Sequence, residues 1–317
     1  MNITSQLVSN SKFKFMAMSA LVHYKNKPMN TKFRLNSLRN KIIKPRSRIT
    51  FETDNFYHDK ESLFYKKGNI QFSMICCPMG KFTKGSKDSF LDAPEGTESI
   101  DKMFLLGESE VTQELFQKVM GFNPSQFKKE NGYSDSDKRP VEKVTWYEAV
   151  MFCNKLSMMF GKKPFYHISV TKGDYHIIKE AIVKINQKAN GFRLPLGKEW
   201  EYAAKAGTNN EWSGTNDEKE LGVFAYFQAN SRINNILQTH TVKGKKPNEW
   251  GFYDMSGNVM EWCWDAHIDP YYGTERRQFR CGSFVALPRG QKVAMSHIEY
   301  PQNYSETIGF RICMNVS

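Results

Sequence analysis

The chain has 317 residues, 40% of them apolar, which is enough to bury a full core in one large domain or two small ones. Its formal net charge is +12, yet residues 1–50 hold eleven Lys and Arg and no acidic residue, and the rest of the chain is nearly neutral. This distribution predicts that the basic charge lies in an arm and not on the surface of a folded domain. No apolar stretch approaches the roughly twenty residues of a membrane span, so the sequence predicts no transmembrane segment.

The basic stretch, residues 1–69, is expected to be a leader or arm without a core of its own, followed by a domain over residues 70–317. Three interpretations stay open. Residues 1–50 contact an anionic partner such as nucleic acid or a membrane surface, or they form a targeting segment, or they are a disordered leader with Met29 as the true start. An apolar run at residues 15–22 resembles a weak signal-peptide core without a clean cleavage pattern.

Six cysteines are spread along the chain: Cys76, Cys77, Cys153, Cys263, Cys281 and Cys313. Adjacent cysteines rarely bridge each other, and the sequence has no C-x-x-C pair of the kind that binds zinc or forms a redox couple. The cysteines are therefore predicted to be small apolar residues of a reducing compartment, which favours the cytoplasm.

The first predicted elements are strands. Residues 70–77 alternate weakly and end at a proline, residues 80–86 form a turn and a strand, and residues 103–106 form a further strand. Residues 87–99 between them are polar and are expected to be a loop.

Two helices follow, each with a threonine at its start. Thr112 is the expected N-cap of a helix that Gly121 ends. Thr145 and Glu148 form a T-x-x-E capping box for a second helix that ends at Gly161. Both helices carry a stripe of apolar residues and no catalytic group.

A hairpin is expected over residues 164–184, because apolar residues alternate on both sides of a Lys-Gly-Asp turn. A third helix is expected over residues 198–206. Leu196 and Gly197 precede it and supply no side-chain cap, which costs only a few tenths of a kcal/mol where Gly takes the cap position. Residues 208–220 are polar and are expected to form a solvated loop.

The most informative stretch is residues 247–265, in which two aromatic runs flank a Ser-Gly-Asn turn. The side chains of Asn258 and Glu261, with the carbonyls of Ser256 and Val259, would give Ca²⁺ the oxygen-only environment that it prefers. The alternative is a tight turn whose Asn and Glu satisfy nearby backbone donors.

Six boxes in this sequence resemble the formylglycine-generating enzyme, or sulfatase-modifying factor, family. They are ESEVT at 108–112, VTWYEA at 144–149, GFRLP with EWEYAAKAG within 191–207, GFYDMSGNVMEW at 251–262, RCGSF at 280–284 and GFR at 309–311. The resemblance spans about residues 72–313. It implies an irregular α+β domain of the C-type-lectin-like kind, with short strands, few helices and much loop.

Enzymes of this family oxidise a cysteine of a sulfatase to formylglycine with O₂ and a copper(I) ion that two cysteine thiolates hold. Those cysteines follow the serine of the RGGS box by three and eight positions. In this sequence the serine is Ser283, so the corresponding positions are Ala286 and Gln291, neither of which supplies a thiolate. The resemblance therefore predicts a binding or scaffold module without copper and without catalytic residues.

The alternative is a metal-dependent oxidoreductase with a relocated site. Cys281 lies near the box serine and Cys263 and Cys313 belong to neighbouring boxes, so a rebuilt thiolate pair is one form of this hypothesis. The other form uses the alternating Asp265, His267 and Asp269 as metal ligands.

The remaining candidate for recognition is the segment from Val285 to Ile308. Tyr, Arg and Asn are enriched there, as in recognition surfaces, and in C-type-lectin-like proteins that retroelements diversify the corresponding stretch contacts the ligand. The candidate contacts with an unknown protein or small ligand are Arg289, Gln291, Lys292, His297, Tyr300, Asn303 and Tyr304. The alternative is an ordinary polar loop across a strand pair.

Overall fold

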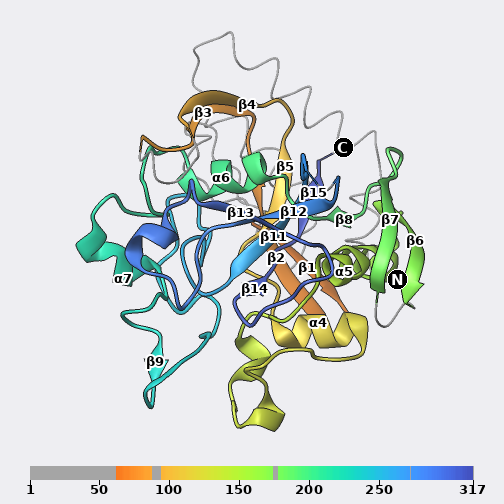
Figure 1. Cartoon of the computed structure of the whole chain (residues 1–317), viewed down its shortest axis with the longest axis horizontal. Helices are drawn as coiled ribbons and strands as arrows, with labels where there is room; N and C mark the ends of the chain where they lie inside the picture. Colours follow the sequence, from red (N-terminus) through yellow and green to blue (C-terminus); the bar gives the residue numbers. More distant parts are fainter. Residues whose placement is uncertain (1–61, 88–93, 174–177, 272, 317) are drawn as a thin grey trace, which may run out of the picture. The chain divides into compact units, whose positions relative to one another are not determined.

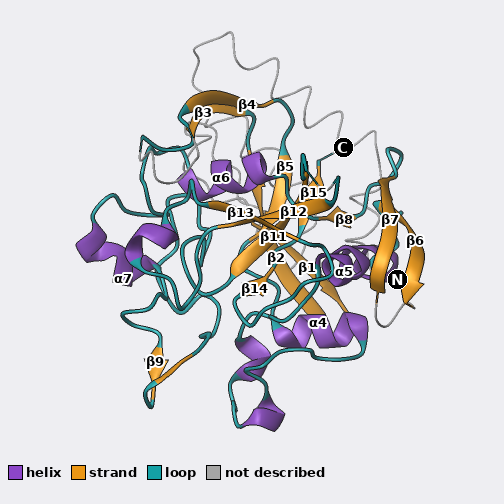
Figure 2. Ribbon diagram, viewed as in Figure 1, coloured by secondary structure: helices purple, strands orange, loops and turns teal. Residues whose placement is uncertain are grey.

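The computed structural model describes residues 62–87, 94–173, 178–271 and 273–316, so residues 1–61 of the arm predicted over residues 1–69 lie outside it. The described part is a mixed α+β fold with short strands, four α-helices and much loop, which confirms the predicted fold class (Figures 1 and 2). The helices are α4 (Gln113–Met120), α5 (Trp146–Met159), α6 (Gly197–Lys205) and α7 (Leu221–Phe224), and 3-10 turns lie at Lys129–Asn131, Ser136–Lys138, Glu218–Glu220 and Pro288–Gln291. None of these helices is long and apolar enough to cross a bilayer.

The main sheet contains both ends of the described chain. Its strand order is β1 (Ser62–Lys67), β2 (Ile70–Cys77), β5 (Phe104–Gly107), β15 (Cys313–Asn315) and β8 (Phe192–Arg193), and all neighbours are antiparallel. Strand β1 pairs with β2 over its full length, so residues 62–67, which the sequence assigns to the arm, form an edge strand of this sheet.

Alternation along these strands divides the core between the two faces of the sheet. Met74 and Leu105 pack in one apolar cluster, whereas Ile75, Leu106 and Cys313 pack in the other. Since successive side chains of a strand point to opposite faces, each short strand serves both clusters.

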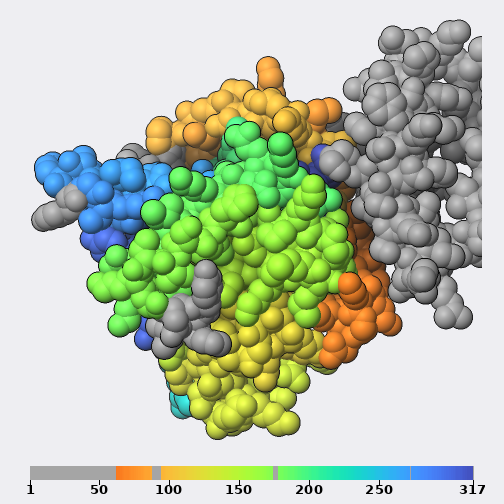
Figure 3. Space-filling view, turned by 90° about the vertical axis from the view of Figure 1, so that its right-hand side faces the viewer, coloured from red at the N-terminus to blue at the C-terminus, as the bar shows by residue number. Residues whose placement is uncertain are grey.

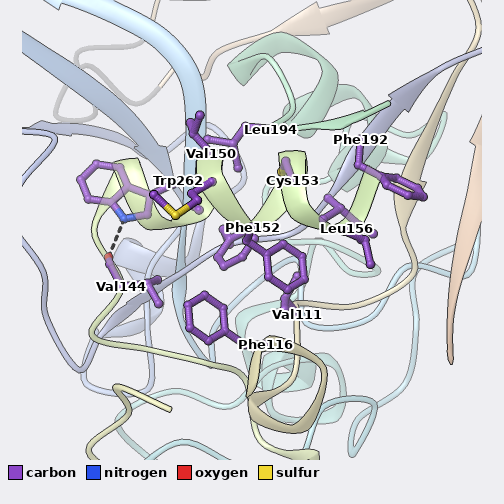
Figure 4. Close-up of a cluster of buried hydrophobic side chains, with 14 of the residues drawn as sticks. Val111, Phe116, Val144, Val150, Phe152, Cys153, Leu156, Phe192, Leu194 and Trp262 are labelled. Atoms are coloured by element: carbon purple, nitrogen blue, oxygen red, sulfur yellow. Dashed lines mark hydrogen bonds between the residues drawn. The ribbon is translucent and has the colours of Figure 1, made fainter. Parts of the chain in front are cut away.

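Helices α4 and α5 cover the first of these faces. Their predicted caps are confirmed, since the Thr112 hydroxyl accepts from the Leu115 amide, and Thr145 and Glu148 form the reciprocal capping box. Phe116 of α4 and Phe152 of α5 stack with ring centroids 5.6 Å apart (Figure 4). The predicted apolar stripes therefore bury against each other and against the sheet.

A second sheet positions the aromatic stretch that the sequence singled out. Its order is β13 (Ser296–Glu299), β12 (Glu275–Arg280), β11 (Met260–Ile268) and β14 (Ile308–Gly309), with β11 and β14 parallel. Trp262 of β11 is fully buried, and its indole N–H donates to the Val144 carbonyl at 3.0 Å (Figure 4). This bond ties the start of α5 to the second sheet.

Three two-stranded hairpins complete the described part: β3 (Gly80–Lys84) with β4 (Gly96–Ile100), β6 (Tyr166–Gly173) with β7 (Ile178–Ile185), and β9 (Arg232–Ile233) with β10 (Ile236–Leu237). The β6–β7 hairpin confirms the prediction for residues 164–184 and spreads over one face of the molecule (Figure 3). Strand β4 corrects the loop predicted over residues 87–99. Its sequence looks like a loop because only Ile100 of β4 is buried.

The N-terminus of α6 shows how the chain replaces a missing cap. Leu196 offers no cap, but the Glu199 carboxylate accepts from the Leu196 amide at 2.8 Å and the Asp265 carboxylate accepts from the Gly197 amide at 2.7 Å. A Cβ at position 197 would lie 1.9 Å from Oε1 of Gln278, so any residue larger than glycine would clash with the Gln278 side chain. Asp265, distant in sequence, thus acts as the cap of this helix.

We expect Asp265→Ala to lower the free energy of unfolding by about 1 kcal/mol, because the Gly197 amide loses its acceptor. Chemical denaturation measures this change. Asp265→Asn keeps an acceptor oxygen and should recover most of the loss; an alanine variant as stable as the parent protein would show that the cap is unimportant.

Candidate functional site

The centre of the signature stretch is a buried ion pair between Glu261 and Arg311. Both side chains are fully buried, and the guanidinium donates to the two carboxylate oxygens at 2.6 Å each. The indole of Trp200 donates to the same carboxylate at 2.7 Å, and Arg311 also donates to the carbonyls of Gly107 and Tyr253. The pair therefore joins α6, both sheets and the loop before the turn.

Asn258 shapes the turn itself. It has a left-handed backbone with φ of 55°, a conformation that Asn tolerates better than most residues. Its amide nitrogen donates to Glu110 at 3.0 Å, its amide oxygen accepts from the His240 backbone, and Glu110 also accepts from the Val259 amide. The carboxylate that braces this turn is thus Glu110, from the EVT box, and not Glu261.

These contacts bear on the predicted calcium ligands. Both oxygens of Glu261 accept hydrogen bonds from Arg311, and the side-chain oxygen of Asn258 accepts one from the His240 backbone amide. A guanidinium beside the carboxylate repels a cation, so the arrangement does not fit Ca²⁺. No group of three or more His, Cys, Asp or Glu suited to a metal occurs in the described ranges.

An excess of buried carboxylates surrounds Arg311. Burial raises the pKa of Glu110 well above its usual value, and the charges of Asp254 and Glu261 raise it further. Burial likewise raises the pKa of Asp254 to about 6, against the opposing effects of the Lys243 amide and Arg311. One oxygen of Asp254 has no hydrogen-bond partner among the described residues. Near neutral pH, repulsion among the carboxylates of Glu110, Asp254 and Glu261 therefore opposes their ionisation around Arg311.

The two positions that the resemblance matches to the family's copper-binding cysteines lie on either side of the 3-10 turn Pro288–Gln291, since Ala286 precedes the turn and Gln291 ends it. Gln291 is fully buried, and its side-chain amide donates to the carbonyls of Ser283 at 2.7 Å and Ala286 at 3.2 Å. Gln291 thus closes its own loop, and its placement corrects the expectation that it contacts a ligand at the surface.

Three cysteines are the candidates for a replacement site. Cys263, Cys281 and Cys313 are buried with Cys77 in one apolar cluster. Burial raises the pKa of Cys281 to about 11 and those of Cys263 and Cys313 well above the usual value. Buried thiols of raised pKa are typical of structural cysteines.

The alternating Asp265, His267 and Asp269 do not converge either. Asp265 caps α6, Asp269 forms an ion pair with Arg276 at 3.2 Å, and His267 is exposed on β11. Each side chain has a separate environment, so they do not present one ligand set.

The candidate recognition segment is partly exposed. Arg289, His297, Asn303 and Tyr304 lie on the surface. Tyr300 is half-buried under the guanidinium of Arg276.

Lys292 is also half-buried, and it forms an ion pair with Glu211 at 2.8 Å beside the ring of Trp212. Sequence reasoning missed the exposed apolar residues of this segment, Val285, Leu287 and Ile298. The sequence does not distinguish them from Val293 and Ala294 of the same segment, which are buried.

Comparison with known proteins identifies the fold family. A model of the sulfatase-modifying factor enzyme 1-like domain matches residues 62–316. The chain belongs to this family. The solved structure of Treponema denticola variable protein 1 is similar over 81% of this chain and 100% of that protein, with 34% identity and a TM-score of 0.70.

Two curated relatives are named for different functions. The chaperone protein LppX of Paenibacillus barcinonensis is 41% identical over 186 residues, which are 53% of this chain and 64% of LppX. The formylglycine-generating enzyme of Streptomyces coelicolor is 30% identical over 148 residues, which are 39% of this chain and 47% of that enzyme. The chain thus spans less than two thirds of the length of these curated relatives.

We expect Asp254→Asn to stabilise the protein above pH 6. A buried carboxyl with a raised pKa binds its proton more tightly in the folded state, so stability falls as pH rises from about 4 to about 6 and stays lowered above that. Asparagine tolerates the φ of 58° at this position and keeps the bond from the Lys243 amide. The gain should be about 1–3 kcal/mol at pH 8 and vanish near pH 4, measured by denaturation across pH; a gain independent of pH would contradict it.

Proposed function

We propose that this chain is a non-catalytic member of its family that binds a polypeptide through the exposed part of residues 285–308. The observation that carries this proposal is Gln291, which occupies a family copper position as a buried amide bonded to its own loop. The burial of Cys263, Cys281 and Cys313 among apolar side chains supports the same conclusion, because reactive and metal-binding thiolates usually lie in partly exposed, electropositive surroundings.

The relatives support a polypeptide as the ligand. The relative with 41% identity is named a chaperone, and chaperones act on other proteins. Identity to the named formylglycine-generating enzyme is lower and covers 39% of this chain. A binding role needs the preserved framework boxes and does not need the two thiolates.

The open edge of β13 supports a mode of binding. The amide of Cys281 donates to the Met295 carbonyl, and the register pairs Phe279 with His297 and Arg277 with Glu299. Because hydrogen-bonded pairs alternate in an antiparallel ladder, the N–H and C=O of Ser296 and Ile298 point away from β12. No described residue bonds to these four groups.

An extended polypeptide can add to such an edge as a further strand, with backbone bonds for affinity and side chains for selectivity. Ile298, which is 41% exposed, stands on this edge, and Tyr304, which is 62% exposed, follows in the same segment. Both offer apolar area to a bound chain.

The absence of thiolates at Ala286 and Gln291 predicts no formylglycine formation. We expect mass spectrometry to find an unmodified cysteine after a Cys-x-Pro-x-Arg peptide is incubated with the purified protein, copper(I) and O₂. The S. coelicolor enzyme is the positive control. Stoichiometric copper and conversion of the cysteine would establish the alternative, an oxidoreductase with a relocated metal site.

We expect Ile298→Pro to weaken binding of reduced, carboxymethylated α-lactalbumin, a permanently unfolded probe, at least tenfold more than Ile298→Ala does. Proline removes an outward N–H and leaves the β12 ladder intact, because the residue at 298 does not donate to β12. Fluorescence anisotropy measures the affinity. Equal losses in the two variants would exclude strand addition, and no loss in either would place binding elsewhere.

A further inference from the structure

The β6–β7 hairpin and the turns at its base carry an unusual concentration of lysine. Residues 155–188 hold seven Lys, no Arg and two acidic residues, although the chain after residue 50 is nearly neutral. Six of these lysines, Lys162, Lys163, Lys172, Lys179, Lys184 and Lys188, form what we call the lysine face. It lies on the side of the molecule that Figure 3 presents.

The charges of the lysine face are compensated only in part. Lys172 forms an ion pair with Glu180, and the two side chains are 63% and 60% exposed. Some lysines outside the hairpin are also paired, as in Lys118–Glu114 and Lys198–Glu98, so the face is distinguished by its density of lysine and not by ion pairing. Lys179, Lys184 and Lys188 are exposed and have no acidic partner among the described residues.

Exposed aliphatic side chains stand among these lysines. The register opposes Lys184 to His167 and Ile182 to Ser169, so all four side chains share the outer face of the hairpin. Ile182 is 54% exposed and Ile185 is 43% exposed. Met158, at the end of α5 beside the base of the hairpin, is 57% exposed. The surface therefore combines cationic heads with apolar groups.

We infer that the lysine face binds the surface of an anionic lipid bilayer. Lysine is a flexible point charge attracted to anionic headgroups, and the isoleucines can enter the boundary between headgroups and acyl chains.

A nucleic acid fits less well. Arginine and exposed aromatic rings are the usual contacts of single strands, and this stretch has no arginine. Its described aromatic residues, Phe160, Phe165 and Tyr166, are buried or half-buried. The sequence expectation that basic charge is confined to the arm is corrected here, because acidic residues elsewhere cancel the hairpin's charge in the total.

The test is sedimentation of the full chain with phosphatidylcholine vesicles that contain or lack phosphatidylserine, at low and at physiological ionic strength. Lys179→Glu/Lys184→Glu/Lys188→Glu should lower partitioning onto the anionic vesicles by roughly 100-fold. The matched control, Lys102→Glu/Lys129→Glu/Lys219→Glu, changes net charge equally at exposed lysines outside the hairpin and should lower it far less. Ile182→Ser/Ile185→Ser should remove the binding that persists at physiological salt.

Equal losses in the two triple variants would overturn the inference, because binding would then depend on net charge or on the N-terminal arm. Unchanged vesicle binding together with weakened binding of a single-stranded RNA by the hairpin variant would also overturn it, since the lysine face would then serve nucleic acid. Far-ultraviolet circular dichroism and thermal unfolding of each variant exclude loss of fold as the cause.

Discussion

The ion pair between Glu261 and Arg311 is the constraint on which the rest of the structure depends. Both side chains are fully buried. Glu261 also accepts a hydrogen bond from the Trp200 indole, and Arg311 also donates to carbonyls of two other segments. Removing one partner of such a pair leaves an uncompensated buried charge, which costs about 3–5 kcal/mol. A long irregular chain with few helices is thereby held at one point, and the loops around it keep their positions without regular secondary structure.

Much of the fold could be predicted from the sequence because its signals are local. The threonine caps of α4 and α5 and the alternation in β6–β7 depend on residues a few positions apart, and the structure has all of them. The contacts that the sequence did not predict join residues that are far apart in the chain. Asp265 as the cap of α6 and Glu110 as the brace of the Asn258 turn pair residues far apart in the chain, which no periodicity records. Strand β4 has mostly solvent-facing side chains, so its composition resembles a loop.

The sequence indicates which stretch forms the candidate site, but it does not indicate the contacts that the side chains make there. The sequence singles out Asn258 and Glu261 as metal ligands, and it does not indicate that Arg311 donates to both oxygens of Glu261. Gln291 was expected at the surface because it lies between Arg289 and Lys292, yet its amide bonds draw it inward. The positions of Ala286 and Gln291 in the family pattern carry the case for a binding role, whereas burial decides which neighbours can contact a ligand.

The place of β15 has a consequence for biosynthesis. This strand, Cys313–Asn315, lies between β5 and β8 and supplies side chains to both apolar clusters. The ribosome synthesises these residues after all the other described strands. Until β15 has been made, the edges of β5 and β8 in the nascent chain have no strand between them. An unpaired strand edge is a site of aggregation, so protection of β5 and β8 during translation matters more here than in a protein whose inner strands are all made early.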